Sequence, residues 1–185
     1  MTGSHAYRDA SDEELAGWSG QGDRRAFDEI VTRHGPFALR VAGRIIPDRL
    51  IAEDIVQEAM LRAWTQAARF DPERAQFRTW LYRIIVNLCI DHRRRIQPAQ
   101  LPEDYDVADP SDSAEELVAA TERNRDLLAA LGSLPPRQRA AMTLVYDEGL
   151  SGAEAGRMMG LSAKAIERLL ARARVFLRDR VQRPT

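Results

Sequence analysis

The residues best suited to chemistry lie in one stretch, QFRTWLYRIIVNLCIDHRRR, which runs from Gln76 to Arg95. Phe77, Trp80 and Tyr82 lie near its start, and three consecutive arginines end it. Aromatic faces can stack on nucleic-acid bases, and arginines bind phosphate in bidentate geometry. An apolar run between these two ends also fits a buried helix. The stretch is therefore either a buried core helix with basic residues at its C-terminal end or a surface that binds nucleic acid.

No catalytic or metal-binding constellation accompanies this stretch. The three histidines are scattered, and Cys89 with His92 forms a single pair, which makes a poor metal site. A glycine-rich phosphate loop is absent from the sequence. Cys89 is the only cysteine, so no intrachain disulfide can form, and its apolar surroundings favour a buried small hydrophobe over a redox role. We predict no enzymatic activity, cofactor, metal or small-molecule substrate.

Charge is distributed unevenly along the 185 residues, although the net charge is only −1. Residues 23–95 carry fourteen arginines against ten acidic residues, and residues 123–185 carry twelve basic against six acidic residues. Between them, residues 96–122 carry eight acidic residues and no basic one. Two basic blocks joined by an acidic segment indicate contacts with a polyanion.

Apolar residues recur at helical spacing in both basic blocks, which predicts an all-α fold of two small helical domains. We expect helices at about 23–34, 37–46 and 50–67, a fourth over the stretch that opens at residue 76, and two more at about 117–131 and 137–146. The segment 96–116 has three prolines and many acidic residues, which favours a flexible linker. The domains are then 23–95 and 117–185, with an N-terminal extension at 1–22.

A helix-turn-helix signal follows in the second domain. Ser151 and Glu154 form a capping box that starts a short helix. Gly160 can adopt the left-handed conformation that ends this helix, and Leu161 can fill the turn. Ser162 can then cap a longer second helix that reaches about residue 180. In such a unit the second helix enters the DNA major groove.

The second helix divides into an apolar stripe and a basic face. Lys164 and Arg168 lie one turn apart near its start, where they can contact guanine or phosphate. Glu167 could accept a hydrogen bond from cytosine or pair with a neighbouring arginine. The inward stripe consists of Ile166, Leu169, Leu170, Ala173, Phe176 and Leu177.

Three motifs in this order resemble the extracytoplasmic-function (ECF) group of bacterial RNA polymerase sigma factors. AEDIVQEAMLRAW at 52–64 is similar to sigma region 2.2, and FRTWLYRIIVNLCIDHRRR at 77–95 is similar to regions 2.3 and 2.4. The segment 134–174 is similar to region 4. The acidic segment resembles the region 3.2 connector, whose charge fits either mimicry of RNA or a plain tether.

The resemblance implies a division of labour among the residues. Those expected to bind the β′ coiled coil of core polymerase are Asp54, Gln57, Glu58 and Arg62. Those expected to bind the −10 promoter element, with a base pocket from loop 70–76, are Asp71, Arg74, Trp80, Tyr82, Arg83, Asn87, Arg93, Arg94 and Arg95. Those expected to bind the −35 element are Ser162, Lys164, Glu167, Arg168 and Arg172.

Some residues in the opening stretch have a structural interpretation that we accept. Phe77, Leu81, Ile84, Ile85 and Leu88 are expected to be core, while Trp80 is either a wedge between bases or core. Family members often carry a small residue and a lysine or serine where this chain has Glu167 and Arg168, which leaves the −35 base preference open.

The resemblance also implies partners and a location. We expect core polymerase (β′ coiled coil and β flap), promoter DNA and an anti-sigma factor that covers the same faces. The polar N-terminus has no signal-peptide core, and no apolar run reaches membrane-spanning length, so we expect no membrane insertion and a cytoplasmic protein. An ordinary helix-turn-helix regulator would leave the first basic block unexplained. A sigma-like decoy that sequesters a regulator would not need the basic second helix.

Overall fold

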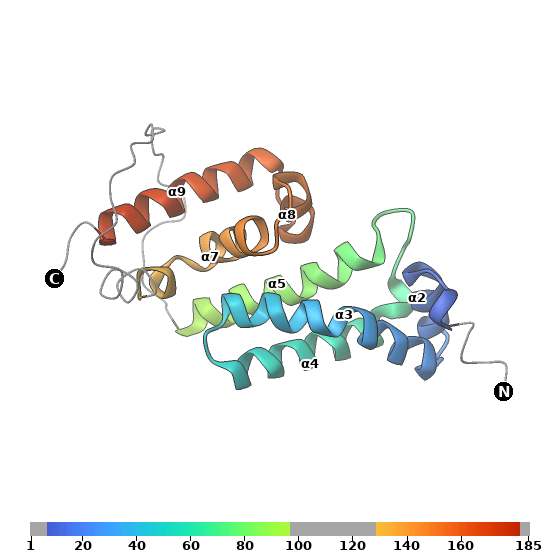
Figure 1. Cartoon of the computed structure of the whole chain (residues 1–185). Helices are drawn as coiled ribbons and strands as arrows, with labels where there is room; N and C mark the ends of the chain where they lie inside the picture. The colour runs from blue at the N-terminus through green and yellow to red at the C-terminus, as the bar shows by residue number, and fades with distance from the viewer. Residues whose placement is uncertain (1–6, 97–128, 182–185) are drawn as a thin grey trace.

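Helices make up both halves of the molecule in the computed structural model, which describes residues 7–96 and 129–181. No residue in these ranges lies in a strand, which confirms the predicted all-α fold. Figure 1 shows one group of helices, α2 to α5, with α7 to α9 lying over it. None of the helices in the described ranges combines the length and apolar character needed to span a membrane. The predicted linker at 96–116 lies, apart from Ile96, outside the described residues.

The first group consists of α2 (Asp12–Gly20), α3 (Arg24–Ile45), α4 (Arg49–Gln66), the short 3-10 turn η1 (Ala67–Arg69) and α5 (Phe77–Ile96). Its first three helices each start after a side chain that accepts backbone hydrogen bonds from the first turn, namely Ser11, Asp23 and Asp48. The Tyr7 hydroxyl donates a hydrogen bond to Asp23, which lowers the pKa of that carboxyl.

Helix α3 corrects the expectation of two helices at 23–34 and 37–46, because it runs unbroken through Pro36. A proline inside a helix removes one backbone hydrogen bond and costs about 3 kcal/mol. Here the ring is exposed, while Ile30, His34, Ala38 and others on one face are buried continuously across it. The burial of that continuous apolar stripe outweighs the local cost.

Helix α2 belongs to the same core as α3, although residues 1–22 were expected to form a separate extension. Leu15 and Ala16 are fully buried in the core of the first group. Arg33 of α3 donates hydrogen bonds to the backbone carbonyls of Tyr7 and Ala10. The predicted boundary at residue 22 therefore does not separate two packed units.

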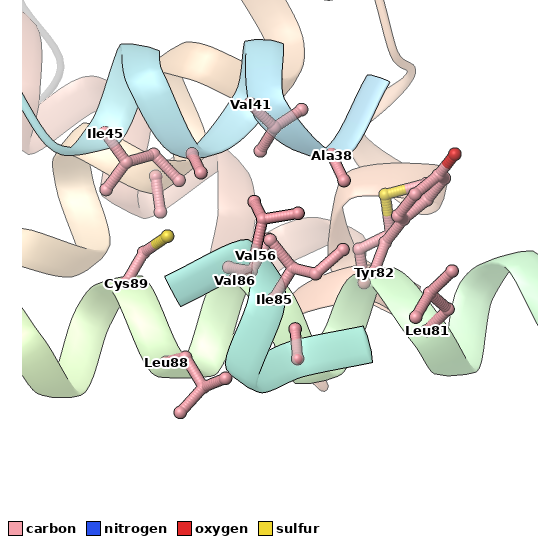
Figure 2. Close-up of a cluster of buried hydrophobic side chains, with 14 of the residues drawn as sticks. Ala38, Val41, Ile45, Val56, Leu81, Tyr82, Ile85, Val86, Leu88 and Cys89 are labelled. Carbon is pink, nitrogen blue, oxygen red and sulfur yellow. The ribbon is translucent and has the colours of Figure 1, made fainter. Parts of the chain in front are cut away.

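The core of the first group is built around α5. Figure 2 shows side chains of α5 packing against Val41 and Ile45 of α3 and Val56 of α4. Of the five residues expected to be core, Ile84 is half-buried and four are buried: Phe77, Leu81, Ile85 and Leu88. Cys89 is also buried, and this burial raises the pKa of its thiol to about 12. Such a thiol stays protonated, in keeping with the predicted apolar role.

The second group consists of α7 (Pro136–Met142), a π-helical turn η2 (Thr143–Asp147), α8 (Gly152–Met159) and α9 (Ala163–Val181). The helix expected at 137–146 is thus α7 followed by the wider turn. Most of the helix expected at 117–131 lies outside the described residues, but residues 129–133 are helical.

The helix-turn-helix geometry matches its sequence signals. Ser151 and Glu154 form the capping box, and Gly160 has a φ of 67°, in the left-handed region. The Ser162 hydroxyl accepts a hydrogen bond from the backbone of Ala165, which starts α9. Leu161 is half-buried against the core between α8 and α9.

Candidate nucleic-acid interface

One face of α4 is exposed and carries all four residues expected to bind polymerase. Asp54, Gln57, Glu58 and Arg62 are exposed, and Arg62 Nε lies 2.7 Å from Glu58 Oε1. Leu61 is 58% exposed and lies one turn beyond Gln57 on the same face. Sequence reasoning missed Leu61, although its helical spacing from Asp54 and Gln57 places it there. Polar side chains around an exposed leucine are typical of a protein interface.

The loop before α5 is closed at its base by three aromatic rings. Phe70, at its start, lies 5.3 Å from Phe77 between ring centroids, and Trp80 lies 5.5 Å from each of them. Within the loop, Asp71 accepts a hydrogen bond from the backbone of Glu73 and forms an ion pair with Arg74 at 3.3 Å. The loop tip is exposed, so its position depends on the aromatic stem, which consists of the rings of Phe70, Phe77 and Trp80.

A cavity of about 590 Å³ opens beside this loop. Arg74, Gln76, Thr79, Trp80 and Arg83 line one side of it, and Gly156, Arg157, Gly160 and Leu161 of the helix-turn-helix line the other. The base pocket expected from loop 70–76 stays a prediction, because the second wall of this cavity comes from the other group of helices. Trp80 is half-buried: its ring contacts those of Phe70 and Phe77, and the residue also lines the cavity.

Tyr82 is a correction to the predicted −10 residues, because it is only 3% exposed. Its ring lies 4.5 Å from that of Phe37, and its hydroxyl is 2.9 Å from His34 Nδ1. His34 Nε2 in turn lies 2.8 Å from an Asp12 oxygen. Burial raises the pKa of Tyr82 to about 12. Tyr82 faces α3 rather than solvent and cannot reach a base in this arrangement.

Arg93 is a second correction, because it is 5% exposed and holds the two groups of helices together. Its guanidinium donates hydrogen bonds to the carbonyls of Ile45, Gly132 and Leu134 at 3.1, 2.6 and 3.0 Å. Burial lowers its pKa. The neighbouring Arg94 and Arg95 are exposed, as expected for phosphate contacts.

Further polar contacts join α3 to the second group, as the approach of these helices in Figure 1 suggests. Arg40 Nε lies 3.0 and 2.9 Å from the two carboxylate oxygens of Glu148, whose side chain is only 4% exposed. Arg139 donates two hydrogen bonds to the carbonyl of Arg44.

Arg83 of α5 is exposed and packs over the turn of the helix-turn-helix, since a methyl group on Gly160 would lie 2.8 Å from its Nη2 atom. Asn87, one turn further along α5, is also exposed.

The start of α9 presents the expected basic face. Lys164, Glu167 and Arg168 are exposed. Within the described ranges no ion pair includes Glu167, so pairing with an arginine finds no support there. Ser162 is exposed but its hydroxyl caps α9. Arg172 is half-buried, and its Nε donates to the carbonyl of Arg168 at 3.4 Å.

These features define a class of protein: a helical module with a basic, aromatic loop face, joined to a helix-turn-helix. The chain matches the family model for Sigma-70 region 2 over residues 30–98 and the model for Sigma-70, region 4 over residues 124–177. Both matches fall on the segments that the sequence motifs indicated.

Comparison with individual relatives identifies the group within the sigma-70 family to which the chain belongs. The chain is 36% identical to the ECF RNA polymerase sigma factor SigM of Mycobacterium tuberculosis, covering 90% of this chain and 83% of that protein. It is 37% identical to SigE of Mycolicibacterium smegmatis over 85% of this chain, but it spans only 63% of that relative. The solved structure of CnrH in complex with the cytosolic domain of CnrY superposes with a TM-score of 0.65 at 29% identity, covering 94% of this chain and 98% of that one. This chain belongs to the ECF sigma factors of the sigma-70 family.

Replacing the buried arginine tests the contact between the helix groups. We expect Arg93→Ala to lower the free energy of unfolding by about 2–4 kcal/mol, because three carbonyl oxygens lose a charged donor. It should also increase the radius of gyration measured by small-angle scattering. Arg95→Ala, an exposed neighbour, should change stability by less than about 0.5 kcal/mol. Equal effects of the two changes would contradict this role for Arg93.

Proposed function

We propose that this sigma factor uses three surfaces: α4 for core polymerase, loop 70–76 with α5 for the −10 element, and α9 for the −35 element. The observation that carries the proposal is the aromatic stem of the loop beside exposed arginines, in the same chain as a basic recognition helix. These parts bind and reshape DNA, and the chemistry of RNA synthesis belongs to the polymerase. We propose no catalytic role for the chain itself.

The α4 face suits the β′ coiled coil. Leu50 and Leu61 are exposed on the side of α4 that carries Asp54 and Gln57. Burying two leucines within a polar rim provides a hydrophobic centre for the interface. The charged side chains around them then favour one partner and one orientation.

The loop and α5 suit strand opening at the −10 element. An unpaired base needs an aromatic or apolar surface to replace its stacking partners, and its backbone needs cations. Trp80, on the rings of Phe70 and Phe77, supplies the aromatic surface, and the exposed Arg74, Arg83, Arg94 and Arg95 supply the cations. Asn87, one turn after Arg83, can hydrogen-bond to a base edge.

The second domain suits duplex DNA at the −35 element. Lys164 and Arg168 project from the first turns of α9, the part of a recognition helix that reaches base edges. We assign base contacts to these two and to Glu167, and backbone contacts to Ser162 and Arg172. The same domain is the proposed partner of the β flap.

The two DNA-binding parts have to separate before both can engage a promoter. The −35 and −10 elements lie about 25 base pairs apart by name, or about 85 Å of B-DNA. Here Arg83 beside the loop touches the helix-turn-helix at Gly160, and Arg93 is buried between the groups. We propose that the segment 96–116 serves as the linker that permits separation.

An anti-sigma partner fits the same surfaces. The match to CnrH covers 94% of this chain, and CnrH was solved in complex with the cytosolic domain of CnrY. We propose that this chain is likewise held by an anti-sigma factor that covers its polymerase- and promoter-binding faces. We also propose that the protein acts in the cytoplasm, because polymerase and chromosomal DNA are located there.

The central test is transcription with purified core polymerase. Mapping transcription start sites after overexpression should reveal a shared pair of −35 and −10 sequences, and the chain should direct initiation from such a promoter in vitro. Tight binding to the duplex without initiation on any of these promoters would instead identify an ordinary helix-turn-helix regulator.

The exposed leucine of α4 provides a sharper prediction. Leu61→Ala should weaken binding to core polymerase by at least about 1 kcal/mol, because it removes an anchor from the centre of the face. The measurement is a titration of labelled sigma factor with core polymerase. Leu39→Ala, a comparably exposed leucine on α3 at 44%, is the matched control and should bind normally. Equal loss in both variants would remove α4 from the polymerase interface.

The recognition helix, α9, provides another testable prediction. Arg168→Ala should weaken binding to the −35 duplex by about 1–3 kcal/mol if Arg168 reads a base, and leave affinity for core polymerase unchanged. Arg174→Ala, an exposed arginine on another side of α9, controls for the loss of one positive charge. A fall in polymerase affinity for Arg168→Ala would show that this face was assigned wrongly.

A further inference from the structure

Helix α2 contacts both ends of the loop that carries the proposed −10 pocket. It precedes the family match, which begins at residue 30, and the sequence gives its residues no function. Its contacts fall on η1, immediately before Phe70, and on Phe77, the first residue of α5. The stretch between these two points is the promoter-opening loop, so the contacts lie where they can fix its geometry.

Glu13 makes the contact at the far end of the loop. Its Oε1 accepts a hydrogen bond of 3.0 Å from the backbone N–H of Phe77, 64 residues away in sequence. The first N–H groups of a helix have no partner within the helix, and a negative charge near them is favourable. Glu13 thus supplies an acceptor for the start of α5 from another helix, in a partly buried setting where water competes less.

Gly20 makes the contact at the near end. A methyl group at this position would lie 2.9 Å from the Cα and N atoms of Ala68 and 3.1 Å from the carbonyl carbon of Ala67. The end of α2 therefore rests directly on the backbone of η1, and only glycine permits that approach. Since η1 leads straight into Phe70, the path of the loop is set from its first residue.

A second link from α2 reaches α5 through α3. Asp12 lies 2.8 Å from His34 Nε2, and His34 Nδ1 lies 2.9 Å from the Tyr82 hydroxyl. With the proton on Nε2, the imidazole donates to Asp12 and accepts from Tyr82. Neighbouring carboxylates of α2 thus fix α5 both at its first residue and five residues further along, on either side of Trp80.

We infer that α2 positions the promoter-opening loop, and that Glu13 is a positioning residue for strand opening at the −10 element. The inference rests on the proposed role of loop 70–76 and α5. The contacts within the exposed loop are local ones between Asp71 and residues 73 and 74, so we infer that the elements at its two ends set its position. Loss of the Glu13 contact loosens the start of α5, and Trp80 and Arg83 move with it.

The test compares Glu13 with its neighbour Glu14 on a promoter found by start-site mapping. Opening by the holoenzyme is measured as permanganate reactivity of unpaired thymines. Glu13→Ala should reduce the opening rate about tenfold, the effect of one charged hydrogen bond. Glu13→Gln keeps an acceptor oxygen and should restore most of that rate. Binding to the −35 duplex and to core polymerase should be unchanged in both.

Glu14→Ala is the control for general weakening of α2. Glu14 accepts hydrogen bonds from the Ser11 backbone and hydroxyl in the capping box of α2 and makes none to α5 among those the structure describes. Its loss should lower thermal stability while the folded fraction opens promoters normally. Equal defects in Glu13→Ala and Glu14→Ala, or no recovery in Glu13→Gln, would reduce the role of Glu13 to stability and overturn the inference.

Trp80→Ala separates this inference from the function on which it rests. It should impair opening strongly, since it removes the aromatic wall of the pocket. If Trp80→Ala opens promoters normally, the proposed −10 surface is wrong and the role of Glu13 falls with it. If Trp80→Ala is impaired and Glu13→Ala is not, only the inference about α2 fails.

Discussion

Burial of α5 from two sides is the constraint on which the rest of the structure depends. Helices α3 and α4 cover one side of it, and α7 and α8 approach from the other, as Figure 1 shows. A helix packed in this way keeps few exposed positions, and those positions decide which polar side chains are available to a partner. Arg83, Asn87 and Arg95 remain exposed, whereas Tyr82 and Arg93, from the same basic and aromatic stretch, are used inside the molecule.

The contact between the two helix groups combines a continuous apolar core with arginines that bind backbone carbonyls and carboxylates. Arg93 and Arg139 donate to carbonyl oxygens at the ends of helices or turns, and Arg40 pairs with the nearly buried Glu148. Such contacts require desolvation of charge and so contribute less net stability than their number suggests. The same guanidinium groups are chemically suited to phosphate. The apolar core around α5 is one cluster that includes buried residues of both groups.

Loop 70–76 contains no helix or strand, and its position depends on the elements on either side of it. Phe70 and Phe77 close its base, while η1 and α5 support its ends. Both supports rest on α2, which is distant in sequence and has its own N-terminal capping box. Rigid helices around a short exposed loop are a common arrangement for sites that must hold a ligand in defined geometry.

The sequence alone was sufficient for features that depend on neighbouring residues. The Ser151–Glu154 cap and the Gly160 turn require only local backbone geometry, so the helix-turn-helix was predictable residue by residue. The apolar positions of α5 likewise predicted most of its buried face, whereas the exposed residues of α4 were expected from the family resemblance. Other features depended on tertiary structure, because distant segments provide the partners. Helix α3 continues through Pro36 because its buried face packs without a break. The Tyr82 hydroxyl contacts His34 of α3, and Arg93 donates hydrogen bonds to carbonyls of the second group. Only the folded chain brings Glu13 within 3.0 Å of Phe77, since no local pattern links residues 64 positions apart.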